Sequence, residues 1–253
     1  MATYLVTGSA RGIGHELVQQ LAAKPDTEIN TIFATSRAEN ARLKALTEQY
    51  PSRVIFVQLT VGDESSMRNA VPIVETVLKV KGLKGLDVLI NNAGVVGSAY
   101  ASEMADLDEI FHVNVTGPHR MIQLFLPLLR KGNEKKVINI SSSVGSITRQ
   151  PRYKDFPAAA YKITKAALNM LTVVWAQELA KEGFTVISQN PGWLQTDEAN
   201  AHADLPVATG VGQILEIARK TGQEGNGRFL NIHVPGWEKK PGLHQYDGKD
   251  LPW

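Results

Sequence analysis

The 253-residue chain contains no cysteine. Disulfides, thiolate metal sites and cysteine nucleophiles are therefore excluded. Net charge is also nearly absent, because 27 basic residues balance 25 acidic residues to within +2 and the basic residues form no long run. Such a chain lacks the basic footprint of a nucleic-acid or membrane surface, so we expect neither partner.

Long apolar runs are missing as well. No stretch approaches the roughly 20 residues that a membrane-spanning helix needs. The six histidines form no His-x-x-x-His pair, so we expect no metal site. The amino terminus runs directly into the strand-like segment Thr3–Thr7. This leaves no room for a secretory signal peptide and predicts a cytoplasmic location.

What the chain does contain is an alternation of short apolar strands with longer helical segments. The strand-like runs are Thr3–Thr7, Thr31–Thr35, Val54–Leu59, Asp87–Ile90, Val137–Ile140, Thr185–Gln189 and Arg228–Ile232. Helical segments include Gly12–Ala23, Ala38–Gln49, Glu64–Val80, Leu107–Lys131 and Ala158–Glu182. This order is typical of βαβ units. Because no linker or repeat divides the chain, we predict one Rossmann-like α/β domain over residues 1–253, with a doubly wound parallel sheet of about seven strands.

Two segments interrupt this rhythm. Ser146–Pro157 is a Pro-containing insertion, and Leu194–Pro206 is a polar segment with few large apolar residues. Each follows a strand, and doubly wound sheets bind ligands beyond the carboxyl ends of their strands. We therefore expect both to border a site, the second as a mobile lid. Surface loops without a role are the alternative.

A glycine-rich turn joins the first strand to the first helix. Gly8, Gly12 and Gly14 let the chain turn sharply and let a pyrophosphate approach the backbone. The N–H groups that open the helix then face the anion. The turn predicts a dinucleotide site, with a tight turn that holds no ligand as the alternative.

The spacing Thr-Gly-x-x-x-Gly-x-Gly resembles the cofactor turn of the short-chain dehydrogenase/reductase family. The family's further motifs follow in order, as Asn91-Asn-Ala-Gly94, Asn114, Ser141-Ser-Ser-Val-Gly145, Tyr161-x-x-x-Lys165 and Pro191-Gly-x-x-x-Thr196. Pro191–Asp197 and Tyr246–Trp253 are most similar to carbonyl-reductase-type members and fungal ketoreductases. The resemblance implies an oxidoreductase that transfers a hydride between a nicotinamide and a carbonyl or alcohol carbon.

The end of the second strand bears on the choice of cofactor. It reads Ser36-Arg37, without the acidic residue that NAD sites place at the ribose. Arg37 can form a charge-assisted fork with a phosphate, to which Ser36 adds a hydroxyl and Arg11 a second cation. We therefore predict NADPH/NADP+ in preference to NADH. Thr60-Val61 stands where the family usually has Asp-Val, which predicts a weaker hold on the adenine.

The resemblance implies further cofactor contacts along the cleft. Asn92 and its neighbours would support the central strand and the ribose, while Leu194 and Thr196 would grip the carboxamide. The expected cofactor-binding residues are Gly8, Ser9, Arg11, Gly12, Ile13, Gly14, Ser36, Arg37, Thr60, Val61, Asn92, Ala93, Gly94, Tyr161, Lys165, Pro191, Gly192, Leu194 and Thr196.

The catalytic residues are expected to be Asn114, Ser142, Tyr161 and Lys165. Tyr161 and Lys165 share a helix face, and a nearby ammonium stabilises a phenolate and brings the tyrosine pKa towards neutrality. The resemblance implies that Tyr161 gives the proton and that Ser142, three residues before Gly145, polarises the carbonyl. It also implies that Asn114 anchors a water in a proton relay.

The expected substrate is a small-molecule carbonyl compound in contact with Ser142 and Tyr161, with Trp193 and Tyr153 as apolar walls. Core packing of Trp193 is the alternative. A homodimer or a homotetramer is open. The alternative function is a family member recruited to a non-redox step, such as cyclisation or isomerisation, or to cofactor-dependent binding and regulation. The intact catalytic set argues against that alternative.

Overall fold

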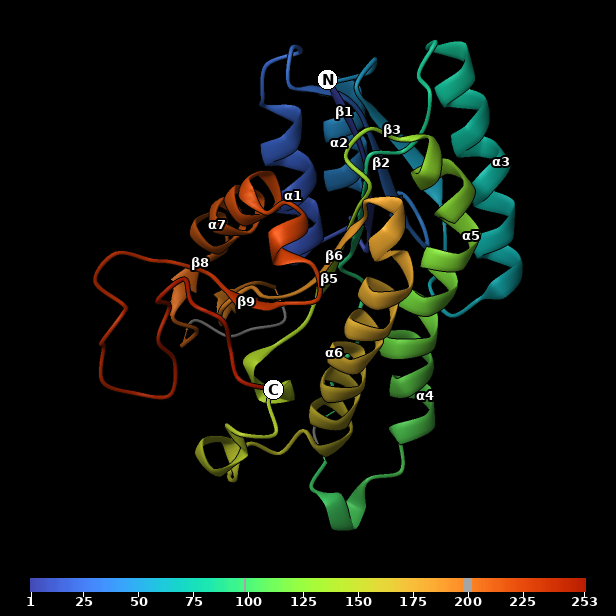
Figure 1. The fold of residues 1–253 in the computed structure, drawn as a ribbon. Helices are drawn as coiled ribbons and strands as arrows, with labels where there is room; N and C mark the ends of the chain where they lie inside the picture. The colour runs from blue at the N-terminus through green and yellow to red at the C-terminus, as the bar shows by residue number, and fades with distance from the viewer. Residues whose placement is uncertain (98, 198–201) are drawn as a thin grey trace.

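A parallel sheet of seven strands, in the order β3-β2-β1-β4-β5-β6-β9, forms the centre of the structure (Figure 1). This computed structural model describes residues 1–97, 99–197 and 202–253. The strands are β1 Ala2–Thr7, β2 Ile29–Ser36, β3 Val54–Gln58, β4 Val88–Asn91, β5 Lys136–Ile140, β6 Thr185–Asn190 and β9 Phe229–Asn231. The predicted fold class is therefore confirmed, with each strand within a few residues of its expected position.

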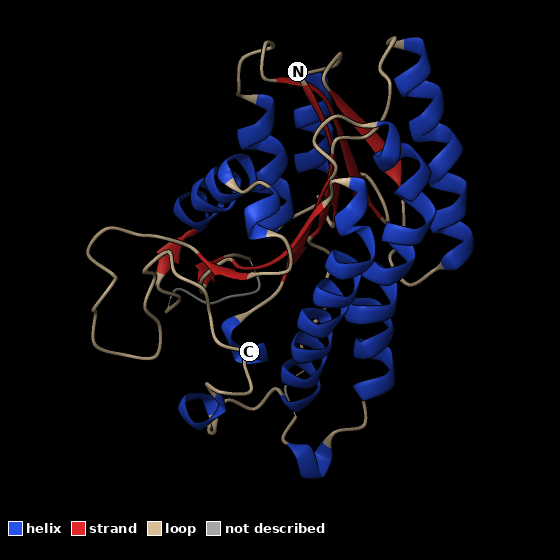
Figure 2. Ribbon diagram, in the orientation of Figure 1, coloured by secondary structure: helices blue, strands red, loops and turns tan. Residues whose placement is uncertain are grey.

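Helices cover both faces of the sheet (Figure 2). One face carries α1 (Gly12–Ala22), α2 (Ala41–Gln49) and α7 (Val207–Lys220), and the other carries α3 (Glu64–Val80), α4 (Leu107–Phe111), α5 (Gly117–Lys131) and α6 (Ala159–Leu179). Successive residues of β1 show the result, because Tyr4 and Val6 pack into one core and Leu5 into the other. A strand buried on both sides has no solvated face, so its sequence is apolar without alternation.

Three helices differ from the expected segments for local reasons. α2 begins at Ala41 because the side chain of Asn40 caps it, accepting a hydrogen bond of 2.9 Å from the Leu43 N–H. The expected helix Leu107–Lys131 is interrupted by a π-helical turn, His112–Thr116. Such turns are frequent at functional sites. α7, which the sequence reading did not identify, follows the segment Leu194–Pro206 directly. Within the described residues, no helix is both long and apolar enough to cross a membrane.

The strand order reverses at β1, which pairs with β2 on one side and with β4 on the other. Connections from the carboxyl ends of these two strands lead to opposite sides, which opens a crevice between them. The segment after β9 also returns to this end of the sheet. It runs antiparallel to β9, with bridges Leu230 to Asp250 and His233 to Asp247.

Candidate active site

A cleft of about 660 Å³ lies beyond the carboxyl ends of the central strands. Most of the residues expected to bind a cofactor line it, namely Gly8, Arg11, Gly12, Ile13, Ser36, Arg37, Thr60, Val61, Asn92, Ala93, Gly94, Tyr161, Lys165, Pro191 and Thr196. Four others, Ser9, Gly14, Gly192 and Leu194, do not line it, and Ser9 and Gly14 are buried behind the wall that the glycine turn forms. The structure thus gathers the loops after β1, β2, β3, β4 and β6, together with α6, at one cleft.

The glycine turn is held rigidly against the loop after β4. The hydroxyl of Thr7 accepts hydrogen bonds from the backbone N–H groups of Asn92 at 2.9 Å and Ala93 at 3.0 Å. The side chain of Asn92 donates back to the Thr7 carbonyl at 2.8 Å. Gly8 and Gly12 have φ values of +70° and +54°, a region that residues with a Cβ rarely occupy. The backbone of the turn is therefore preset before any ligand arrives.

Two of the expected residues behind the wall contribute through packing. The hydroxyl of Ser9 is buried and donates to the Val6 carbonyl at 2.9 Å. A Cβ on Gly14 would overlap the carbonyl oxygen of Gly8. This close approach lets α1 begin directly beneath the turn, which directs its first N–H groups towards the cleft.

The outer end of the cleft carries positive charge. The exposed side chains of Arg11 and Arg37 both line it. Ser36 lies beside them, but its hydroxyl donates to the Ala38 carbonyl at 2.7 Å. An anion that binds here would therefore compete with that internal hydrogen bond for the Ser36 hydroxyl. Thr60 and Val61 line the adjacent wall.

The inner end of the cleft holds Lys165 and Tyr161, both on α6. Only 4% of Lys165 is exposed, and its Nζ donates to the Ile140 carbonyl at 2.7 Å. The Nζ lies 5.4 Å from the centre of the Tyr161 ring. Burial lowers the pKa of Lys165 to about 8, because an ammonium loses its hydration there. The buried ammonium of Lys165, which has lost its hydration, therefore lies beside the phenol of Tyr161.

The three serines after β5 are distinguished by their partners. Ser141 donates to the side chain of Asn169 at 2.6 Å, and the Ser143 hydroxyl shares a 2.8 Å hydrogen bond with the Tyr153 hydroxyl. Within the described part of the chain, the Ser142 hydroxyl makes only a long contact of 3.4 Å, as acceptor from the Val144 N–H. Ser142 is thus the serine whose hydroxyl is least committed to the fold.

Asn114 lies in the π-helical turn and joins three segments. Its Oδ1 accepts from the Val95 N–H at 2.9 Å, and its Nδ2 donates to the Val95 carbonyl at 2.9 Å and to the Thr164 hydroxyl at 3.1 Å. Both amide hydrogens are therefore used by the protein. The side chain positions the loop after β4 against α6, and only the remaining lone pair of Oδ1 is left for a water.

The segment after β6 is better anchored than its composition suggests. Leu194–Gln195 (β7) pairs in parallel with Leu205–Pro206 (β8), and Leu194 and Leu205 are each only 3% exposed. The segment was expected to have too few large apolar residues to hold itself down, but two of them anchor its ends; its closure over the cofactor as a lid stays a prediction. The middle of that expected lid, residues 198–201, lies outside the described residues.

The two expected substrate walls have different environments. Trp193 is 41% exposed, whereas Tyr153 is only 3% exposed. Tyr153 lies in the expected insertion Ser146–Pro157, which the carboxyl-terminal segment holds in place. The hydroxyls of Ser146 and Thr148 donate to the carbonyls of Pro252 and Trp253, at 2.6 and 2.7 Å.

Sequence reasoning missed several residues that the structure places at or near the cleft. Asn40 lines it, and its amide also donates to the Ala10 carbonyl in the glycine turn at 2.8 Å. Asp197 lines it as well and pairs with Arg42 of α2 at 2.6 Å. The helix-capping preference of asparagine was a usable signal for Asn40. The pairing of Asp197 with Arg42 depends on tertiary structure and left no sequence signal.

Comparison with known proteins identifies the family. A family model described as short chain dehydrogenase matches residues 2–204. The chain belongs to the short-chain dehydrogenase family. The NADPH-bound carbonyl reductase from chicken fatty liver is a similar solved structure, with 31% identity, a TM-score of 0.86, and coverage of 100% of this chain and 99% of that one.

Two fungal relatives are similar over nearly the whole chain. The short chain dehydrogenase gsfK of Penicillium aethiopicum is 32% identical and covers 100% of this chain and 99% of its own length. The norsolorinic acid ketoreductase of Aspergillus parasiticus is 28% identical, with coverage of 99% and 90%. The expected membership of the family is therefore confirmed.

The burial of Lys165 predicts a cost in stability. Because its pKa falls from 10.5 to about 8 on folding, the folded state binds the proton less well than the unfolded state does. The cost is fully present below about pH 8 and is relieved as the pH rises to about 10.5, since the slope of stability with pH is positive where the unfolded chain holds more protons. Lys165→Met should therefore raise the free energy of unfolding at about pH 7 by up to about 3 kcal/mol.

Chemical denaturation at about pH 7 and about pH 10 measures this effect. The advantage of Lys165→Met over the natural chain should shrink at the higher pH. The control is Lys44→Met, whose lysine is 63% exposed on α2 and should show no such pH-dependent gain. A Lys165→Met advantage that is the same at both pH values would contradict the buried ammonium.

Proposed function

We propose that this chain reduces a ketone or aldehyde with NADPH, with Tyr161 as the proton donor, or catalyses the reverse oxidation of a secondary alcohol. It is an NADP-dependent oxidoreductase that acts on C=O and CH–OH groups. The observation that carries the proposal is the buried Lys165 ammonium beside Tyr161, at the inner end of a cleft whose outer end bears Arg11 and Arg37. The similar chicken protein is a carbonyl reductase with NADPH bound.

The residues of the cleft fit this cofactor. Gly8 and Gly12 form a backbone cradle free of side chains, which suits a pyrophosphate at the start of α1. Arg11 and Arg37 supply the guanidinium groups that an additional ribose phosphate requires, and the residue directly after β2 is Arg37 instead of an acidic residue that would repel the phosphate. Thr60 in place of the family's aspartate leaves the adenine with a weaker partner. When bound, the reduced nicotinamide supplies the hydride.

The chain's own residues handle the proton and the developing charge. Tyr161 donates its phenolic proton to the carbonyl oxygen, and the Lys165 ammonium stabilises the phenolate that remains. Ser142 donates a hydrogen bond to the same oxygen, for which its weakly committed hydroxyl is available. Asn114 acts by fixing Val95 against α6, and a water on its free Oδ1 lone pair would connect the Lys165 region to solvent.

The substrate enters between Trp193 and the serines after β5. Trp193 follows Pro191, which lines the cleft, and is half exposed, so its ring is available as an apolar wall. Tyr153 is buried and bonded to Ser143, so it positions the loop that carries Ser142. A cytoplasmic location stays a prediction.

The first test of this proposal removes one oxygen atom. Tyr161→Phe should preserve the fold and the NADPH affinity while turnover of a ketone falls by roughly 10² or more, because the proton donor is lost. Turnover is measured as NADPH oxidation, and NADPH affinity by titration. Tyr50→Phe is the matched control, since that hydroxyl has only a 3.4 Å contact with Gln49 and lies away from the cleft. Reduction by Tyr161→Phe near the natural rate would rule out Tyr161 as the acid.

The second test concerns the outer end of the cleft. Arg37→Asp should raise the KM for NADPH roughly ten- to hundredfold and leave the KM for NADH nearly unchanged, because a charge-assisted contact with phosphate contributes about 1.5–3 kcal/mol. Arg219→Asp is the control, since Arg219 lies on α7 in a separate hollow with Met1 and Tyr4. An equal loss with both cofactors would show that Arg37 does not recognise the phosphate.

We also propose that α6 joins two copies of the chain in a homodimer, from which a homotetramer would need a second interface. Ile163, Met170 and Val174 lie on one face of this helix and are 44%, 64% and 48% exposed. A two-fold axis would place this stripe against its own copy. Met170→Glu should then shift the mass measured by light scattering from dimer to monomer. A natural chain that is monomeric at all concentrations would contradict this interface.

A further inference from the structure

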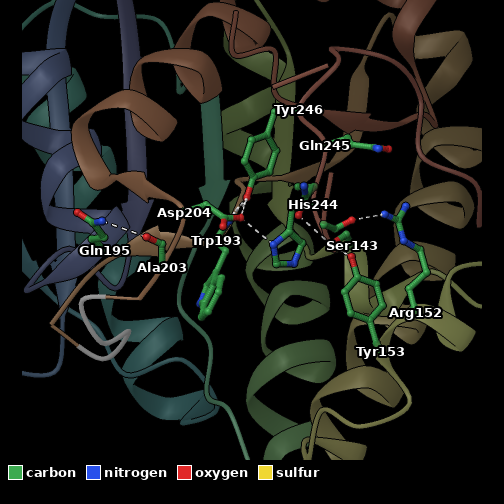
Figure 3. A network of polar contacts seen from close by, with 12 residues as sticks. Ser143, Arg152, Tyr153, Trp193, Gln195, Ala203, Asp204, His244, Gln245 and Tyr246 are labelled. Atoms are coloured by element: carbon green, nitrogen blue, oxygen red, sulfur yellow. Dashed lines mark hydrogen bonds and ion pairs between the residues drawn. The ribbon is translucent and has the colours of Figure 1, made fainter. Parts of the chain in front are cut away.

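A cluster of aromatic side chains around Asp204 includes Trp193, which lies two residues after Pro191 of the cleft lining (Figure 3). At its centre is His244, on the segment that returns after β9. Its Nδ1 lies 2.7 Å from Oδ2 of Asp204, and the same oxygen accepts a 2.6 Å hydrogen bond from the Tyr246 hydroxyl. The Tyr246 oxygen in turn accepts from the Trp193 N–H at 3.0 Å. The cluster therefore fixes His244 relative to Trp193.

The imidazole of His244 lies between the half-exposed ring of Trp193 and the buried ring of Tyr153. Its centre is 5.7 Å from the Trp193 ring, which is edge-on, and 6.0 Å from the Tyr153 ring, which is stacked on it. Tyr153 is bonded to Ser143, the neighbour of Ser142. His244 is therefore linked through Tyr153 to the loop that carries Ser142 and lies against the half-exposed ring of Trp193.

The hydrogen bond to Asp204 determines which ring nitrogen of His244 is available. A carboxylate can only accept, so Nδ1 carries the proton and Nε2 of the neutral ring presents a lone pair. Burial lowers the pKa of His244, assisted by Arg152 and Arg149 and opposed by Asp204, which favours that neutral form. Within the described residues Nε2 has no hydrogen-bond partner, and it is not sealed from solvent. Nε2 of His244 is therefore an oriented hydrogen-bond acceptor beside the half-exposed indole ring of Trp193.

We propose that His244 is a substrate-binding residue whose Nε2 accepts a hydrogen bond from a hydroxyl group on an aromatic ring packed against Trp193. The preferred substrates are therefore aryl ketones that carry a ring hydroxyl. This inference rests on the proposed ketone reduction at Tyr161, because it concerns the part of the same substrate that lies further from the reacting carbon.

A purely structural role for the His–Asp pair gives a different expectation. The chain contains a second pair of this kind, in which Nε2 of His233 lies 3.0 Å from Glu238. His233 is on the same returning segment, but its side chain is 52% exposed, and within the described residues its ring contacts neither Trp193 nor Tyr153. If such pairs served only to hold the segment, replacing either histidine would change stability and leave substrate preference unaltered. His233 therefore provides the matched control.

The experiment compares acetophenone, its ring-hydroxylated isomers and their methyl ethers as substrates with NADPH. A methyl ether keeps the oxygen but cannot donate to Nε2. In the natural enzyme, kcat/KM for at least one hydroxylated isomer should exceed that for its ether, mostly through KM. The ratio should fall roughly 3- to 10-fold in His244→Phe, as expected for one neutral hydrogen bond, and stay unchanged in His233→Phe. Acetophenone itself, which carries no ring hydroxyl, is the reference substrate for each variant.

A second variant guards against misfolding. In His244→Asn the amide nitrogen takes the place of Nδ1, so the bond to Asp204 can persist while Nε2 is lost. Calorimetric titration of the hydroxylated isomers into each NADP+-loaded protein measures binding independently of turnover. A ratio that is the same in the natural enzyme and both His244 variants, or that changes equally in His233→Phe, overturns the proposal. Loss of all ketone turnover in the natural enzyme would instead overturn the proposed function, and the titration would still test His244.

Discussion

The ammonium of Lys165 is buried and donates a hydrogen bond to a backbone carbonyl, and several neighbouring parts of the fold hold it in that position. Ile140 presents that carbonyl at the end of β5. Gly145 allows α6 to pack against the loop after β5, since a Cβ there would overlap the backbone and side chain of Lys165. Asn114 fixes the opposite wall. A charge held in this way cannot relax when the phenol loses its proton, so its stabilising effect is present in advance.

The sequence predicted the parts of the molecule that repeat or that rest on local chemistry. Strands such as β1 and β6 are apolar because both of their faces are covered, and helices follow each of them at regular intervals. The glycine turn and the Tyr161–Lys165 pair depend on spacing within one segment, and the structure places them at one cleft. The end of β2 was readable for the same reason, since Arg37 is adjacent to the strand itself.

The parts that escaped prediction depend on contacts between distant segments. Nothing near Leu194 or Leu205 shows that they pair with each other, so the segment between them was expected to lack anchors. The interruption at His112–Thr116 has no proline or glycine to announce it before Gly117. His244 stands 40 positions from Asp204, and the return of the chain after β9 brings the two together. Similarly, Tyr153 was expected to form an apolar wall for the substrate, but its side chain is buried and its hydroxyl is bonded to Ser143.

The residues proposed to select the coenzyme and those proposed to select the substrate lie in different parts of the chain. The residues at the outer end of the cleft, from Gly8 to Val61, belong to the first quarter of the sequence, while Ser142, Tyr153, Trp193 and His244 all belong to the second half. The two regions meet along the sheet and at the cleft, where Thr196 lies against Gly12 and Asp197 pairs with Arg42. Mutations can therefore accumulate in the later segments and alter which molecule is recognised while the earlier ones continue to hold the same coenzyme. A lineage built on this plan can diversify its chemistry of recognition without having to acquire a new source of reducing power.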